Sequence, residues 1–262
     1  MQKITTRKIL NKKGKIPIVC LTAYTKSIAE IVDKYCDIIL VGASLGMVLY
    51  GMKNTKEVKM NTMISHGKTV KTATKRSLVV LDMPYKTYIN KSTAYKNEKK
   101  MIKLTKCDAV KLEGGKKIVN IIKHLVSKGI PVMGHVGLLP QSSNRFKLKG
   151  KNLAQRKKIF NDAMAVSNSG VFALVVECVV EELAKKITKY VSVPTIGIGA
   201  SKYCDGQILV VNDMLGLSSF SARFVKKYSN LKKIINISIK KYSQDVKHRR
   251  FPSLKNVYKF NK

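Results

Sequence analysis

Eight short apolar runs rich in β-branched residues recur along the chain, and they limit its fold more than any other feature. They lie at residues 16–23, 38–42, 78–84, 109–114, 131–137, 173–179, 194–200 and 207–213. Apolar residues follow one another in these runs without strict alternation with polar ones. This pattern is typical of strands that are buried on both faces of a parallel sheet. The sequence therefore predicts eight buried, parallel strands.

Segments of helical periodicity separate most of these runs. Clear examples are residues 25–35, 61–74, 116–129 and 155–170, and the last two end on a glycine, which is a common helix stop. Regular alternation of strand and helix predicts a (β/α)8 barrel, the TIM-barrel fold. Only residues 201–206 separate the last two runs, too few for a full crossover helix. We therefore expect a minimal connection or a shifted strand boundary there.

The length and composition suit one large α/β domain. The chain has 262 residues, of which 45% are hydrophobic. We expect residues 1–224 to form the barrel and residues 225–262 to form a lysine-rich helical C-terminal arm that is not a separate domain. No apolar run approaches the roughly 18 residues of a membrane span, and the N-terminus lacks the apolar core of a signal peptide. We expect a cytoplasmic protein without a membrane partner.

The cysteines and histidines argue against disulfides and zinc. The five cysteines lie far apart with no CxxC pair, at positions 20, 36, 107, 178 and 204. Their odd number and spacing predict reduced thiols. The four histidines form no HxH or HxxxH arrangement. Any metal is therefore expected to be held by oxygen.

The net charge is unusual for an α/β protein. Fifty-one Lys and Arg residues against 15 Asp and Glu residues give +36, which suggests nucleic acid or another polyanion as a partner. Only seven of the basic residues are arginine, however, and nucleic-acid sites favour the arginine fork. Lysine is also spread along the whole chain. The pattern favours an incidental surface charge, and nonspecific polyanion affinity stays open as an alternative.

Polar side chains stand at the carboxyl ends of several predicted strands, where barrel enzymes place their reactive groups. Ser44 follows the second run, and Asp82 stands near the end of the third. Lys111 and Glu113 end the fourth run, and they face the same side because they are two residues apart on a strand. Glu177 lies near the end of the sixth run. These side chains are candidates for one shared site.

Three carboxylates and a lysine at one buried rim favour a bound cation. The carboxylates would repel one another and lose hydration unless they bind positive charge. Oxygen ligands from separate strands suit Mg²⁺, which takes one or two carboxylates and completes its shell with water or substrate. A 2-oxo acid could chelate such an ion while Lys111 balances its charge. The ion would stabilise an enolate, and Glu177, standing off the metal, could remove the proton.

Two further residues and one loop near the predicted strand ends could have a structural role instead of a catalytic one. His135, near the end of the fifth run, could donate to a backbone carbonyl or take part in catalysis, and both interpretations stay open. Cys178 is predicted to pack in the core, because strand alternation points it away from Glu177 and no cation is placed to stabilise its thiolate. The loop at residues 197–201 is predicted to be a tight turn rather than a phosphate site.

Motifs in the same order as a known family extend over roughly residues 3 to 225. They are AYTKSIAEIVDKY, IILVGASLGMVLYG, VVLDMPY, VKLEGG, GHVGLLPQS, LVVECV and IGIGAS followed by CDGQILVVNDMLGL. With these motifs the chain resembles the ketopantoate hydroxymethyltransferase family. The resemblance implies a (β/α)8 barrel, a homodecamer and bound Mg²⁺. It also implies hydroxymethyl transfer from 5,10-methylenetetrahydrofolate to 3-methyl-2-oxobutanoate, giving 2-dehydropantoate in the pathway to pantothenate and coenzyme A.

The resemblance also implies roles for individual residues. Asp82 and Glu113 match metal ligands, Glu177 matches the general base, and the substrate contacts match Ser44, Asp82 and Lys111. In family members similar to this chain, the second strand leads into Gly-Asp-Ser-Leu-Gly, whose aspartate is a ligand of metal and substrate.

Here Ala43 stands at the place of that aspartate. We expect weaker metal binding and slower enolisation, with water in the vacant ligand position. Two alternatives to an impaired enzyme stay open. One is a pseudoenzyme that retains the barrel, and the other is a basic protein that binds polyanions through its arm.

Overall fold

The computed structural model describes residues 2–143, 147–218, 220 and 222–258. The chain divides into two compact units, Met1–Val211 and Asn212–Lys262. The last four residues of the predicted arm, 259–262, lie outside the described residues.

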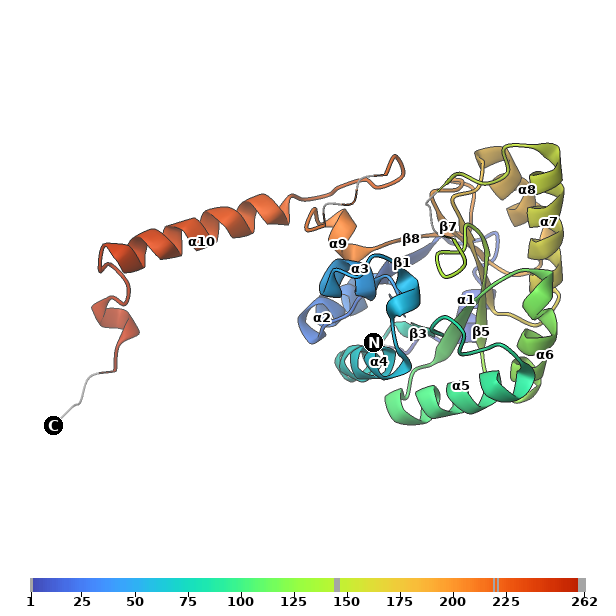
Figure 1. Ribbon diagram of the computed structural model, residues 1–262, viewed down its shortest axis with the longest axis horizontal. Coiled ribbons are helices and arrows are strands. Elements are labelled where there is room, and N and C mark those ends of the chain that lie inside the picture. Colours follow the sequence, from blue (N-terminus) through green and yellow to red (C-terminus); the bar gives the residue numbers. More distant parts are fainter. Residues whose placement is uncertain (1, 144–146, 219, 221, 259–262) are drawn as a thin grey trace. The chain divides into compact units, whose positions relative to one another are not determined.

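Eight parallel strands in the first unit close into a barrel in the order of the sequence (Figure 1). Each strand pairs with its neighbours in the chain, and β1 closes the barrel against β8. The predicted (β/α)8 fold is confirmed. The strands are β1 (Ile18–Thr22), β2 (Ile38–Val41), β3 (Leu78–Asp82), β4 (Ala109–Glu113), β5 (Val132–Gly137), β6 (Ala173–Glu177), β7 (Thr195–Ile198) and β8 (Gly206–Leu209).

Helices cover the outside of the barrel between most of the strands (Figure 1). Glycine allows one of them to pack very closely: a Cβ atom at Gly134 in β5 would lie 2.4 Å from Val166 Cγ1 in α7. The helices of this unit are α1 (Thr6–Leu10), α2 (Lys26–Tyr35), α3 (Leu45–Tyr50), α4 (Met60–Ala73), α5 (Lys91–Thr105), α6 (Val119–Ser127), α7 (Leu153–Ser167) and α8 (Glu181–Tyr190), with 3-10 turns η1 (Thr55–Glu57) and η2 (Lys116–Ile118).

The connection between β7 and β8 contains no helix. The expected minimal connection is therefore found, but the predicted end of the eighth strand is wrong. The strand ends at Leu209, and the chain turns into the short helix α9 (Val211–Met214). The Val211 amide donates to Thr22 Oγ1 at 3.0 Å instead of continuing the strand.

Apolar side chains fill the barrel interior and close one of its ends. Strand residues such as Leu78 and Ile196 form one buried cluster with Ile4 and Ile9 from the N-terminal segment. Ion pairs fix this segment to residues that precede strands: Lys12 contacts Asp37 at 2.7 Å and Lys13 contacts Asp205 at 2.9 Å. The opposite end of the barrel, where the strands end, is left for polar side chains.

The second unit contains a 17-residue helix, α10 (Leu231–Lys247), and a 3-10 turn, η3 (Leu254–Asn256). No side chain of α10 is buried. The helix confirms the predicted helical arm, whereas the predicted boundary between residues 224 and 225 stays a prediction. Among the described residues, no helix combines the length and apolar character needed to cross a membrane. All five cysteines are free thiols, as predicted.

Candidate active site

Charged side chains from three strands meet at the carboxyl end of the barrel. Asp82 ends β3, Lys111 and Glu113 belong to β4, and Glu177 ends β6. The strand register brings them together, because Asp82 is paired with Lys111 and Glu113 is paired with His135 of β5. All five side chains are buried. The structure thus gathers the charged residues that the sequence placed at strand ends.

Lys111 lies at the centre of this group. Its Nζ atom is 2.8 Å from Asp82 Oδ1, 3.2 Å from His135 Nδ1 and 3.8 Å from Glu113 Oε1. Burial alone would lower the pKa of this amine, but the Asp82 and Glu113 carboxylates outweigh it and raise the pKa of Lys111. The lysine is therefore a fixed positive charge among carboxylates.

His135 connects Lys111 to Glu177. Burial and the Lys111 charge lower the pKa of His135 to about 4, so its ring is neutral. An ammonium group can only donate, so Nδ1 accepts from Lys111 and the ring proton resides on Nε2. Nε2 lies 3.2 Å from Glu177 Oε2, although without the alignment of a hydrogen bond. The ring thus lies between the central lysine and the candidate base.

Glu177 has the character of a base that can take up a proton near neutral pH. Burial raises its pKa to about 8, with Asp82 adding to the shift and Lys111 opposing it. A carboxylate with such a raised pKa in a buried polar site can accept a proton from a substrate.

Asp82 and Glu113 are each fixed by a backbone amide in the same manner. The Ala43 amide donates to Asp82 Oδ2 at 2.8 Å, and the Gln141 amide donates to Glu113 Oε2 at 3.0 Å. The other oxygen of each carboxylate, Oδ1 or Oε1, faces Lys111. Asp82 Oδ1 and Glu113 Oε1 therefore both face the ammonium group of Lys111, and the region between the two carboxylates stabilises positive charge.

The donor set fits Mg²⁺ as a partial site. In the part of the chain that the structure describes, no three His, Cys, Asp or Glu side chains are gathered as a complete metal site. Mg²⁺ does not need such a cage, since it binds through one or two carboxylates and takes water and substrate oxygens as further ligands. Asp82 and Glu113 can supply these two carboxylates. The Ala43 methyl group cannot supply a third.

The loop that follows β2 places Ser44 at the carboxyl-terminal rim of the barrel. Its hydroxyl is 2.7 Å from the hydroxyl of Tyr24, a residue that follows β1. A Cβ atom at Gly42 would lie 3.0 Å from Ser44 Oγ and 3.5 Å from Asp82 Oδ2, so the two side chains flank the same short stretch of backbone. The loop thus places a hydroxyl group beside the carboxylates.

Sequence reasoning missed two residues that contact Glu113. Tyr88 OH donates to Gln141 Oε1 at 2.8 Å and lies 3.3 Å from both the backbone N and O atoms of Glu113. Gln141 Nε2 donates to the carbonyl of Met83 at 2.8 Å. The one available signal for Gln141 was a polar residue after Pro140, in the loop that follows the strand carrying His135.

Cys178 is buried next to the site, as the sequence predicted. Burial, with the neighbouring Glu177 charge, raises the pKa of its thiol to about 12. The sulfur therefore stays protonated, which agrees with a packing role.

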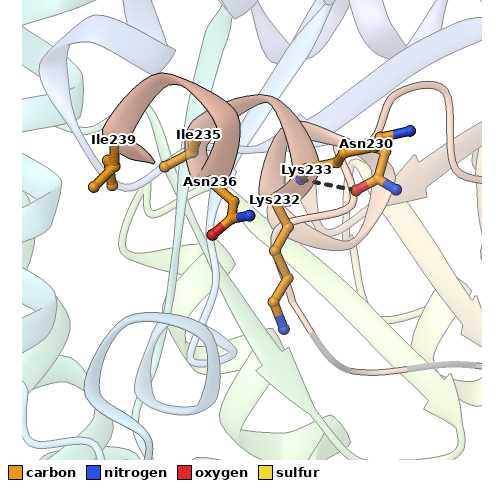
Figure 2. Close-up of a pocket in the computed structure, with 6 residues that line it drawn as sticks. All are labelled: Asn230, Lys232, Lys233, Ile235, Asn236 and Ile239. Carbon is orange, nitrogen blue, oxygen red and sulfur yellow. Dashed lines mark hydrogen bonds between the residues drawn. The ribbon is translucent and has the colours of Figure 1, made fainter. Parts of the chain in front are cut away.

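A hollow on the second unit lies along α10 (Figure 2). Figure 2 shows side chains of the helix and of its N-cap, Asn230, whose Oδ1 accepts from the Lys233 amide at 3.2 Å. None of the lining residues is a carboxylate or a histidine, so this hollow offers no carboxylate or imidazole ligand for a metal ion. Its lining residues are Asn230, Lys232, Lys233, Ile235, Asn236 and Ile239.

Comparison with known proteins identifies the family. The family model described as ketopantoate hydroxymethyltransferase matches residues 3–254. The chain belongs to the ketopantoate hydroxymethyltransferase family. A relative named 3-methyl-2-oxobutanoate hydroxymethyltransferase from Pelagibacter ubique is 54% identical over 255 residues, covering 96% of this chain and 99% of the relative. The protein of the same name from Phenylobacterium zucineum is 47% identical, covering 98% of this chain and 95% of the relative.

Solved structures show the same barrel at low sequence identity. A phosphonopyruvate hydrolase in complex with oxalate and Mg²⁺ superposes with a TM-score of 0.63 at 10% identity, covering 98% of this chain and 93% of that chain. A 2,3-dimethylmalate lyase of the PEP mutase/isocitrate lyase superfamily gives 0.61 at 14% identity, covering 97% and 88%. These structures support the fold, and the family relatives connect the chain to hydroxymethyl transfer in pantothenate synthesis.

Proposed function

We propose that the chain transfers a hydroxymethyl group from 5,10-methylenetetrahydrofolate to 3-methyl-2-oxobutanoate, giving 2-dehydropantoate. The observation that carries this proposal is the buried group formed by Asp82, Lys111, Glu113 and Glu177 at the rim of a barrel of this family. It combines two carboxylate oxygens directed at one place, a fixed positive charge and a carboxylate with a raised pKa.

The polar side chains at the rim suit a 2-oxo acid. Lys111 can balance the charge of the substrate carboxylate, and the Ser44 hydroxyl can donate to a substrate oxygen. Asp82 and Glu113 would hold Mg²⁺ and also fix Lys111 in place. When bound, Mg²⁺ supplies positive charge that makes the carbon next to the 2-oxo group more acidic.

Glu177 is the proposed base. In its ionised form it removes the proton from C3 of the substrate, and the electron pair of the C–H bond passes into the enolate. C3 then forms a bond to the one-carbon unit of the folate, both C–N bonds of that unit break, and water supplies the hydroxyl group. Tetrahydrofolate leaves with one proton on each freed nitrogen, one from the water and one from Glu177. His135 keeps Lys111 and Glu177 at a fixed separation during these steps, because its ring contacts both.

Ala43 is proposed to weaken the site without dismantling it. The methyl group offers no ligand, but the Ala43 amide still orients Asp82. Loss of a directly contacting group commonly costs a factor on the order of 10² in activity. The pseudoenzyme alternative requires instead that no turnover remains and that Ala43→Asp fails to restore it.

The second unit supports association with other copies of the chain. Apolar side chains three or four residues apart form an exposed row on α10: Ile235, Ile239, Tyr242 and Val246. Such a row on a helix commonly packs against another surface. We propose a homo-oligomer, with the decamer implied by family resemblance as the specific expectation. Light scattering across a salt series tests it, and a monomer at every salt concentration would contradict it.

Product formation tests the proposed reaction directly. The purified chain is incubated with 3-methyl-2-oxobutanoate, 5,10-methylenetetrahydrofolate and Mg²⁺, and 2-dehydropantoate is measured by mass spectrometry. We expect slow, Mg²⁺-dependent product formation that Glu177→Gln abolishes. Absence of product from both the unmodified chain and Ala43→Asp would support the pseudoenzyme alternative instead. Product from Ala43→Asp alone would reject that alternative and would indicate a local lesion at this position.

A further inference from the structure

The two oxygens of the Glu113 carboxylate lie in different environments. Oε2 accepts from the buried amide of Gln141 at 3.0 Å, whereas Oε1 faces Lys111 Nζ and His135 Nδ1, each at 3.8 Å. A hydrogen bond to one oxygen of a carboxylate orients the group and directs its other oxygen toward the site. The Glu113 carboxylate thus directs one oxygen, Oε1, into the site.

Tyr88 is hydrogen-bonded to the Gln141 side chain and lies against the backbone of Glu113. The phenol has one proton, and the 2.8 Å contact to Gln141 Oε1 takes it in preference to the 3.3 Å contact to the Glu113 carbonyl. The phenol oxygen in turn accepts from the Glu113 amide. Burial raises the pKa of Tyr88, so the phenol keeps its proton at neutral pH.

Gln141 is fixed at both ends of its side-chain amide. Nε2 donates to the Met83 carbonyl, next to Asp82, and Oε1 accepts from Tyr88. Gln141 is 1% exposed, so water does not compete for these hydrogen bonds. The amide therefore couples the end of β3, the end of β4 and the loop after β5.

We propose that Tyr88 and Gln141 are positioning residues that hold Glu113 so that it offers Oε1 alone to a bound cation. This inference rests on the proposed function, in which Asp82 and Glu113 are cation ligands. It has a consequence for the choice of cation. Ca²⁺ readily takes both oxygens of a carboxylate and has longer ligand distances, whereas Mg²⁺ requires compact octahedral geometry. A carboxylate held to one oxygen therefore favours Mg²⁺ over Ca²⁺.

The test measures cation binding without substrate, using the full-length chain. Mn²⁺ binding is followed through the electron paramagnetic resonance signal of free Mn²⁺, and Mg²⁺ or Ca²⁺ is then added as a competitor. Gln141→Met keeps the side-chain length but removes both hydrogen bonds, and Tyr88→Phe removes only the hydroxyl. We expect Mg²⁺ affinity to fall roughly tenfold in each variant and Ca²⁺ affinity to fall less.

Matched variants lie outside the site. Gln155→Met removes an amide whose Oε1 accepts from the Gly150 amide, and Tyr50→Phe removes a hydroxyl 2.8 Å from His66 Nε2. Both should bind the cations as the unmodified chain does. Circular dichroism reports folding, and Tyr88→Phe alone is sufficient if Gln141→Met does not fold.

Each outcome separates the inference from the function on which it rests. Unchanged affinities in both variants would overturn the positioning role. An equal loss of Mg²⁺ and Ca²⁺ affinity would overturn the one-oxygen orientation. No Mn²⁺ binding by the unmodified chain would reject the cation site itself, and with it the inference.

Discussion

The backbone amide of Ala43 donates to Asp82 Oδ2 at 2.8 Å. Ala43 has no side chain that could bind a metal ion, yet its backbone orients the carboxylate of Asp82. Ala43 is 1% exposed, and its backbone lies at the rim beside Ser44. The aspartate that the family resemblance leads us to expect at this position would therefore differ from Ala43 by one side chain in an otherwise ordered loop. This relationship is why we expect a weakened site rather than a collapsed one.

Ala43→Asp should strengthen cation binding. A third carboxylate at this position adds an oxygen ligand and negative charge next to Asp82, and the amide hydrogen bond to Asp82 does not depend on the side chain. We expect Mg²⁺ affinity to rise by about tenfold or more. Competition with Mn²⁺ measures the change. Ala43→Asn is the matched control of nearly the same size without charge, and an equal gain in both variants would contradict a ligand role for the aspartate.

Lys111→Met should make the fold depend on the cation. Without the ammonium group, Asp82 and Glu113 lose a buried partner, and breaking such a pair costs about 3–5 kcal/mol in the free energy of unfolding. Mg²⁺ can then replace the missing positive charge. We expect a lower Tm than that of the unmodified chain, and a larger rise in Tm when Mg²⁺ is added.

Lys158→Met is the comparison for this variant. Lys158 is an exposed lysine 2.6 Å from the buried carboxylate of Asp162, and loss of this partly exposed pair should cost less than loss of the fully buried Lys111 charge. The proposed cation site would be contradicted if Mg²⁺ raised the Tm of Lys111→Met no more than that of Lys158→Met.

Glu98 in α5 should make the protein less stable as the pH rises. It is fully buried, and neither carboxylate oxygen has a hydrogen-bond partner among the described residues. Burial raises its pKa from 4.5 to about 8 in the folded chain. Below pH 4.5 the group is protonated in both states and costs nothing. Between pH 4.5 and 8 the unfolded chain releases the proton while the folded chain keeps it, so the cost of folding grows by about 1.4 kcal/mol per pH unit.

Glu98→Met removes this titration. We expect the Tm of the variant to exceed that of the unmodified chain at pH 8, and the difference to become smaller toward pH 5. Glu30→Met, at an exposed position in α2, should follow the unmodified chain at every pH. A constant difference between Glu98→Met and the unmodified chain from pH 5 to pH 8 would show that the carboxylate does not titrate as described.

The sequence predicted the barrel because its strands are buried on both faces and therefore form continuous apolar runs. The end of the eighth strand was not predictable in this way. The run at residues 207–213 continues past Leu209 without a polar residue before Asn212, yet the chain leaves the sheet because the Val211 amide bonds to Thr22. That contact joins residues far apart in the chain and leaves no local pattern.

The same reasoning explains which site residues the sequence could suggest. Asp82, Lys111, Glu113 and Glu177 stand at strand ends, and parallel strands bring those ends together. Tyr88 and Gln141 lie in loops, and their contact with Glu113 depends on how two loops fold over the rim.

The most direct test is deuterium exchange at C3 of 3-methyl-2-oxobutanoate in D₂O with Mg²⁺ and without folate, followed by NMR. It isolates proton removal by Glu177 from all later steps. We predict exchange by the unmodified chain, faster exchange by Ala43→Asp, and a loss of about 10²-fold or more in Glu177→Gln, whose Mg²⁺ affinity should be unchanged. Exchange that persists in Glu177→Gln, or no exchange by either the unmodified chain or Ala43→Asp, would contradict the proposed site.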